Sequence, residues 1–95
     1  MTRYYIGMTV RVRASFRDVD DVLSDPSAIT LVMKTPVGTF TYTYADAEIT
    51  REDTGIYYRD VLLTAGYKWE YHWESTGNPS TAIQGSLFVE PSNVD

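Results

Sequence analysis

Residues 67–74 read YKWEYHWE, with an aromatic ring at every odd position and a charged or titratable side chain at every even position. This alternation predicts a β-strand, because successive side chains of a strand point to opposite faces of its sheet. We expect four rings to fill the interior of the fold, namely Tyr67, Trp69, Tyr71 and Trp73. Trp73 lies nearest the following loop and is expected to be partly exposed. The alternative is an exposed strip of rings that binds sugars or proline-rich segments.

The same alternation recurs in short segments separated by turn residues. The predicted strands are residues 10–17, 29–34, 39–45, 48–51, 56–64, 67–75 and 82–90. No segment has a convincing helical period. The sequence therefore predicts an all-β fold, a seven-stranded antiparallel immunoglobulin-like β-sandwich. With 95 residues, of which 43% are hydrophobic, the chain fits a single immunoglobulin-like domain over residues 1–95, with a short N-terminal arm at residues 1–7.

The inward positions of these strands define the expected core. Its members are Val10, Val12, Phe16, Leu31, Phe40, Tyr42, Tyr57, Tyr67, Trp69, Tyr71 and Leu87. The phase of residues 56–64 stays open between two sets: Tyr57, Val61 and Leu63 with Arg59 beside them, which we favour, or Ile56, Tyr58 and Leu62. A tyrosine whose hydroxyl bonds to the main chain at a strand corner is typical of such sandwiches, and we favour Tyr67 over the tyrosines of DTGIYY for that place.

Composition argues against several kinds of function. The net charge is −5 and the isoelectric point about 4.6, so nucleic acid and anionic membranes are not expected partners. The chain has no cysteine and one histidine, His72, which excludes disulfides, thiolate zinc sites and cysteine nucleophiles. We expect no catalytic residues, no cofactor and no metal site. Residues 1–16 contain no apolar run of signal-peptide length, so we expect a soluble chain made in the cytoplasm.

The acidic segment RDVDDVLSD, residues 17–25, allows two interpretations. Its carboxylates could converge on calcium, which prefers several oxygen ligands from one loop. The segment lacks the glycine and the terminal glutamate of an EF-hand, and a solvated acidic loop is the favoured reading.

Residues outside the expected core are candidates for partner contacts: Tyr4, Tyr5, Arg11, Arg13, Arg17 and Phe88. The arginines would lie on the solvent face of the first predicted strand, where charges discourage edge-to-edge aggregation. The alternative is that the arginines dock against an acidic partner surface, since guanidinium groups suit planar contacts with carboxylates. Phe88 is an apolar residue in an otherwise polar row, which also suits an interface.

The segment DTGIYYRDVLLTAGYKWEYHW, followed by AIQGSLFVEP, resembles the ending of bacterial-type immunoglobulin-like domains. Together with GMTVRVRASFRDVDDVLSDPSAITLVMKTPVG it resembles the small stand-alone immunoglobulin-like proteins encoded among the virion genes of tailed bacteriophages. The resemblance covers nearly the whole chain. Leu87 departs from it, because a phenylalanine is usual at that position.

The resemblance implies a non-enzymatic structural protein of a tailed bacteriophage virion. The expected role is a capsid decoration or cement protein that is assembled in the bacterial host cytoplasm and acts by protein-protein contact. Its expected partners are the major capsid protein or other virion proteins, with self-association as a further option. A neck or tail component is one alternative. A carbohydrate-binding or adhesion module that uses Trp73, Tyr4 and Tyr5 is another.

Overall fold

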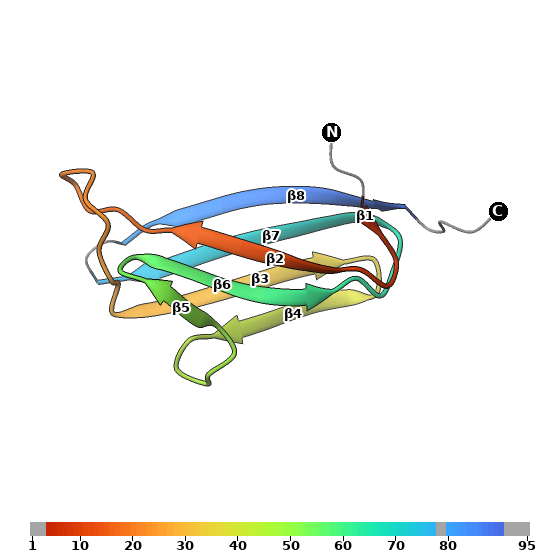
Figure 1. Cartoon of the computed structure of the whole chain (residues 1–95), viewed down its shortest axis with the longest axis horizontal. Helices are drawn as coiled ribbons and strands as arrows, with labels where there is room; N and C mark the ends of the chain where they lie inside the picture. Colours follow the sequence, from red (N-terminus) through yellow and green to blue (C-terminus); the bar gives the residue numbers. More distant parts are fainter. Residues whose placement is uncertain (1–3, 78–79, 91–95) are drawn as a thin grey trace.

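The computed structural model describes residues 4–77 and 80–90, which form eight β-strands and no helix (Figure 1). The strands are β1 (Tyr4–Tyr5), β2 (Thr9–Ser15), β3 (Ala28–Thr35), β4 (Gly38–Thr43), β5 (Thr50–Asp53), β6 (Ile56–Leu62), β7 (Tyr67–Thr76) and β8 (Ala82–Glu90). The all-β prediction is confirmed. The predicted number of seven strands is wrong, because the segment predicted as an N-terminal arm contributes the short strand β1.

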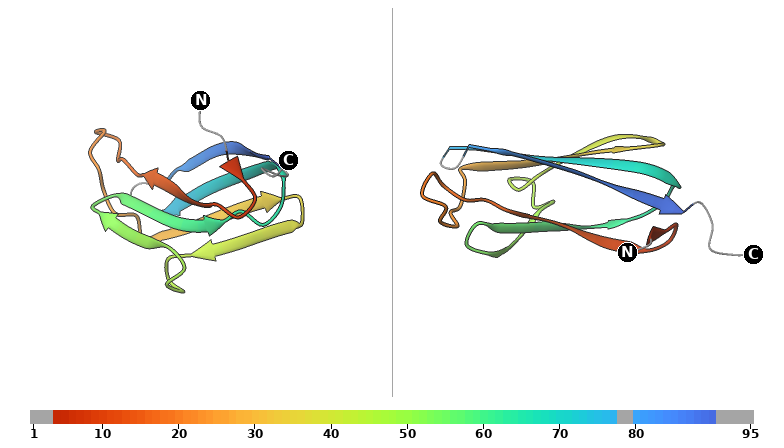
Figure 2. Two further views of the ribbon diagram at one scale, coloured as in Figure 1. Left: turned by 45° about the vertical axis from the view of Figure 1, so that its right-hand side comes forward. Right: turned by 90° about the horizontal axis from the view of Figure 1, so that it is seen from above.

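The strands form two sheets that pack as the layers of a sandwich (Figure 2). One sheet has five strands in the order β1-β8-β7-β3-β4, and the other has three in the order β2-β6-β5. All neighbours run antiparallel except β1 and β8, which are parallel, with Tyr4 beside Val89 and Tyr5 beside Glu90. The fully antiparallel prediction is therefore wrong at this one edge.

β7 is the central strand of the larger sheet, and its alternation places two tryptophans in the core. Trp69 and Trp73 are both buried, and the Trp73 ring makes an edge contact with Phe16, the residue that follows β2, with centroids 6.2 Å apart. The indole nitrogen of Trp69 donates a hydrogen bond to the carbonyl of Ala65. The expectation that Trp73 is partly exposed is wrong, since its exposed fraction is 0%. This ring is thus unavailable for stacking on a sugar.

Most of the expected core residues lie in the core. Val12, Phe16, Leu31, Tyr57 and Trp69 are buried, and Val10, Tyr42, Tyr71 and Leu87 are partly buried against them.

Two expected core residues are exposed instead. Tyr67 is 61% exposed because its φ of +80° breaks the regular strand geometry, and its ring contacts Phe88. Phe40 lies beside Met33 and so points to the inner face, but it is 43% exposed. In Figure 1, β5 lies beside the arrowhead end of β4, away from the β3-β4 hairpin.

The phase favoured for residues 56–64 is confirmed. Tyr57, Val61 and Leu63 are buried. Arg59 shares their face and is accommodated by two contacts. Its guanidinium lies 3.8 Å from the ring centroid of Tyr42 and donates a hydrogen bond of 2.7 Å to the carbonyl of Glu48.

The loop between β2 and β3 is fixed to the turn between β5 and β6 through Asp25. Its carboxylate accepts hydrogen bonds from the Arg51 guanidinium, the Gly55 amide and the Tyr57 hydroxyl. Tyr67, favoured from the sequence as the corner tyrosine, is exposed, and the hydroxyl of Tyr57 bonds to a side chain and not to the main chain. Gly55 has a φ of +71°, and a Cβ there would lie 2.8 Å from the carbonyl oxygen of Phe16 and the amide of Ser24, so only glycine fits.

Candidate interaction groove

A groove of about 440 Å³ lies between β2 of the smaller sheet and β8 of the larger sheet. We call it the edge groove, and its lining residues are Tyr4, Val10, Arg11, Val12, Arg13, Tyr71, Ser86, Leu87 and Phe88. Four of the six residues singled out from the sequence as partner contacts line it: Tyr4, Arg11, Arg13 and Phe88. They come from three strands, so their proximity depends on the fold.

The arginine wall of the edge groove is held by carboxylates across the smaller sheet. Arg11 lies beside Asp60 in the ladder and bonds to both its carboxylate oxygens, at 2.8 and 3.2 Å. The Arg11 guanidinium also lies 3.8 Å from the centroid of the Tyr58 ring. These hydrogen bonds raise the pKa of Arg11 and lower that of Asp60.

Arg13 has an equivalent partner one strand further away. It reaches over β6 to Glu52 on β5, with two hydrogen bonds of 3.1 and 2.7 Å. Both arginine side chains stay 50% exposed. They are thus orientated by internal carboxylates and still accessible from solvent. The alternation of residues 10–17 predicted the arginine row but gave no information about these partners, because they lie 49 and 39 residues away in the chain.

On the β8 side of the edge groove, Phe88 belongs to an aromatic pair whose other ring, Tyr67, lies outside the lining. Phe88 is 55% exposed and meets Tyr67 in an edge contact, with centroids 6.3 Å apart. Tyr71 contributes to the same side of the groove, because its ring lies over Gly85, its partner in the β7-β8 ladder. The sequence identified Phe88 as an apolar residue in a polar row. It did not identify Tyr67, whose positive φ the alternation could not reveal.

Two predicted contact residues lie outside the groove lining. Tyr5 is half-buried beside Glu90 at the end of β8. Arg17 follows β2 and bonds to its own loop, through the carbonyl of Asp21 at 3.0 Å. The predicted row of three arginines is therefore a pair, Arg11 and Arg13, with Arg17 attached to the adjacent loop.

The carboxylates of the acidic loop bond mainly to protein groups. Asp18 accepts hydrogen bonds from the amides of Asp20 and Val22, which stabilise the turn. Asp25 accepts hydrogen bonds from Arg51, Gly55 and Tyr57. Across residues 4–77 and 80–90, no three or more histidine, aspartate or glutamate side chains are grouped so that they could hold a metal ion.

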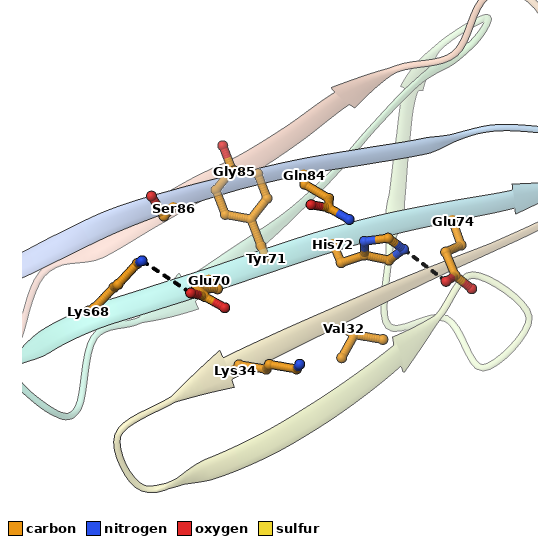
Figure 3. Close-up of a pocket in the computed structure, with 10 residues that line it drawn as sticks. All are labelled: Val32, Lys34, Lys68, Glu70, Tyr71, His72, Glu74, Gln84, Gly85 and Ser86. Carbon is orange, nitrogen blue, oxygen red and sulfur yellow. Dashed lines mark hydrogen bonds and ion pairs between the residues drawn. The ribbon is translucent and has the colours of Figure 1, made fainter.

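A second hollow, of about 580 Å³, lies on the outer face of the larger sheet (Figure 3). Its side chains come from β3, β7 and β8 and include two close pairs. Lys68 lies 3.2 Å from Glu70, and Nε2 of His72 lies 2.8 Å from Glu74. The even positions of YKWEYHWE thus form a polar outer face, as predicted, on which Lys68 balances the charge of Glu70.

No protein-family model matches the chain, and neither a curated protein nor a solved structure was found to resemble it. In the part of the chain that the structure describes, no helix is long and apolar enough to span a membrane.

Proposed function

We propose that this chain is a non-enzymatic structural protein of a tailed bacteriophage virion, and that it decorates the capsid exterior by binding through the edge groove. Its partner in this proposal is an acidic, partly apolar surface of the major capsid protein or of another virion protein.

The strand order supports the immunoglobulin-like part of the proposal. In immunoglobulin sandwiches, strands B, E and D are neighbours in one sheet, and strands C, F and G are neighbours in the other. Here β2, β6 and β5 form one sheet, and β3, β7 and β8 are neighbours in the other. The first strand differs, because β1 pairs with β8 and not with β2.

The observation that carries the proposal is the composition of the edge groove. Tyrosine and arginine are enriched among the residues that dominate binding energy at protein interfaces, where they cluster in well-packed pockets. The groove brings together Tyr4, Tyr71, Arg11 and Arg13, with the exposed ring of Phe88 at its rim. The hydrogen bonds to Asp60 and Glu52 favour one orientation of each arginine, which lowers the side-chain entropy that binding must still remove.

A small contact is sufficient for a decoration protein. A standard interface buries roughly 800 Å² on each partner, and the surface area of this chain is 5949 Å². Many copies, each with a modest interface, add their binding energies over one particle. The bound copies would raise the resistance of the particle to rupture.

The proposal is tested by adding purified chain to particles that lack it and measuring the bound fraction by co-sedimentation. Phe88→Ser, and separately Arg11→Ala combined with Arg13→Ala, are expected to weaken binding by roughly tenfold or more, the effect of about 1.4 kcal/mol. Val19→Ser is the matched control for Phe88. Val19 is 97% exposed and lies in the loop after β2, at the opposite end of the sandwich from Tyr67 and Phe88 (Figure 1).

Thermal melts establish that each variant is folded before its binding is compared. Equal binding by all variants would remove the edge groove from the proposal. Failure of the unmodified chain to sediment with particles would remove the virion role itself.

A further inference from the structure

The outer strand β4 lacks the protection that the other edges of this sandwich carry. β1 has only two residues, and β2 carries Arg11 and Arg13. β5 reads TRED and its pairing with β6 is irregular between Arg51 and Asp53. Short length, charge and irregular pairing all discourage the addition of a further strand. β4 reads GTFTYT over six residues and carries no charge.

The main-chain groups of Thr39 and Thr41 point to the open side of β4. The amide of Tyr44 bonds to the carbonyl of Ile29 on β3, whereas the amide and carbonyl of Thr43 bond to Glu48 on the other side. Main-chain direction alternates along a strand, so Phe40 and Tyr42 also bond towards β3, and Thr39 and Thr41 face outward. These two residues present two amides and two carbonyls, a short template for strand pairing.

Phe40 adds a partly exposed apolar group to this edge. Its side chain lies on the inner face of the larger sheet beside Met33, yet it stays 43% exposed. A strand added to β4 would place its own inward residue opposite Phe40.

We propose that two copies of this chain pair through β4, antiparallel and about a two-fold axis at Phe40, to give a continuous ten-stranded sheet. Thr39 of each copy lies opposite Thr41 of the other and exchanges both main-chain hydrogen bonds with it. This register uses the outward groups of both threonines and leaves the Thr43 bonds to Glu48 intact. The two Phe40 rings meet on the inner face.

Two features favour a second copy as the occupant. The register places Tyr42 opposite Gly38 of the other copy, the same cross-strand tyrosine-glycine pair that Tyr71 and Gly85 form within the chain. Asp46 and Glu48 follow β4, and Lys34 lies near the β3-β4 hairpin. The antiparallel arrangement brings the acidic pair of each copy towards Lys34 of the other, which places opposite charges near each other. A strand without charge places no like charges opposite each other when it pairs with itself.

The edge groove and β4 lie at opposite edges of the larger sheet, since β8 and β4 are separated by β7 and β3. Dimerisation through β4 thus leaves the groove open, and this inference stands whether or not the chain is a virion protein.

Sedimentation velocity of the full chain over a concentration series tests the proposal. We expect a monomer-dimer equilibrium. Thr41→Pro removes an outward amide that β3 does not use and is expected to weaken dimerisation by roughly tenfold or more. Thr41→Val keeps that amide and is the matched control, with dimerisation close to that of the unmodified chain. Thermal melts check that both variants are folded.

Cysteine cross-linking tests the register, because the chain has no cysteine of its own. Phe40→Cys is expected to form a disulfide-linked dimer on mild oxidation, since directly opposite residues of a non-hydrogen-bonded pair have Cα atoms about 4.5 Å apart. Val37→Cys is exposed on the same hairpin, but its two copies would be about 20 Å apart in this register, so it is not expected to cross-link.

A monomer at every concentration, with no cross-linking of Phe40→Cys, would overturn the proposal. Equal dimerisation of Thr41→Pro, or equal cross-linking of Val37→Cys, would place the contact elsewhere and also overturn it. A chain that stays monomeric and gains protection of the Thr39 and Thr41 amides only when a different protein binds would show that the occupant of β4 is a foreign strand.

Discussion

The hydroxyl of Tyr57 donates a hydrogen bond of 2.9 Å to the carboxylate of Asp25, 32 residues earlier in the chain. The same carboxylate accepts hydrogen bonds from Arg51 and from the Gly55 amide, and one aspartate therefore connects the loop before β3 to the β5-β6 turn. Burial of the phenol, together with this bond to Asp25, raises the pKa of Tyr57 to about 12. Protonation of Asp25 in acid would weaken this connection between the two segments.

We predict that Asp25 makes the stability of the chain dependent on pH in the acid range. The hydrogen bonds from Arg51, then that from the Gly55 amide, lower its pKa from 3.8 to about 2. A carboxyl whose pKa is lower in the folded state stabilises the fold above its unfolded pKa and loses that effect as it becomes protonated. The unfolding temperature should therefore fall as the pH drops from 3.8 towards about 2. Asp25→Asn should be less stable than the unmodified chain at neutral pH and less sensitive to pH across this window. Parallel pH profiles for the two proteins would show that Asp25 is not the responsible group.

Tyr57→Phe tests the hydroxyl separately from the ring. The ring packs edge-on against Phe16 and Tyr44, and phenylalanine keeps both contacts. A hydrogen bond to a charged group is worth about 1.5 to 3 kcal/mol, and we expect the lower end because Asp25 keeps its other donors. Urea denaturation measures the difference. Tyr58→Phe is the matched control, since its hydroxyl lies on the opposite side of β6, and it should be close to neutral.

Gly85 is predicted to be intolerant of a side chain because the Tyr71 ring occupies the space. A Cβ at residue 85 would collide with the hydroxyl and ring carbons of Tyr71. Overpacking of this kind costs about 1 to 3 kcal/mol, so Gly85→Ala should be destabilised by that amount. Combining it with Tyr71→Ala should recover part of the loss, and a double-mutant cycle measures the coupling. Strictly additive effects of the two substitutions would argue against the contact.

The arginine pairs of the smaller sheet are expected to contribute little to stability. Arg11, Asp60, Arg13 and Glu52 are all at least 37% exposed, and exposed ion pairs are largely screened by water and salt. Arg11→Ala with Arg13→Ala should shift the unfolding temperature only slightly, and less in high salt than in low salt. A large, salt-independent loss would show that the arginines are needed for the fold, and would prevent their use as binding probes.

Alternation predicted much of this structure from the sequence, since it depends only on the geometry of a strand. It placed Trp69 and Trp73 on the inner face of β7, but it favoured the correct phase of Tyr57 without settling it, because Arg59 shares that face. Alternation failed where the backbone departs from regular strand geometry, and where an inward-facing side chain is not buried. Tyr67 is exposed at a positive φ, and Phe40 lies on the inner face but stays 43% exposed.

Sequence reasoning singled out as partner contacts four of the nine residues that line the edge groove, and it gave no information about the shape of the groove. Tyr4, Arg11, Arg13 and Phe88 stood out because they broke a pattern or formed an unexplained row. These residues line one groove because β1 pairs parallel to β8, and because β2 and β8 lie on the same side of the sandwich. The partners of the arginines, Asp60 and Glu52, are set by the β2-β6-β5 order, which no local pattern encodes.

The most direct measurement is the number of copies of this chain in purified particles. Particles from a culture that expresses the chain from its native genome would be banded on a density gradient, and the polypeptide quantified against the major capsid subunit by mass spectrometry. We predict a copy number comparable with that of the capsid subunit. A few copies per particle would move the protein to the neck or tail, and complete absence from the particle band would contradict the virion role.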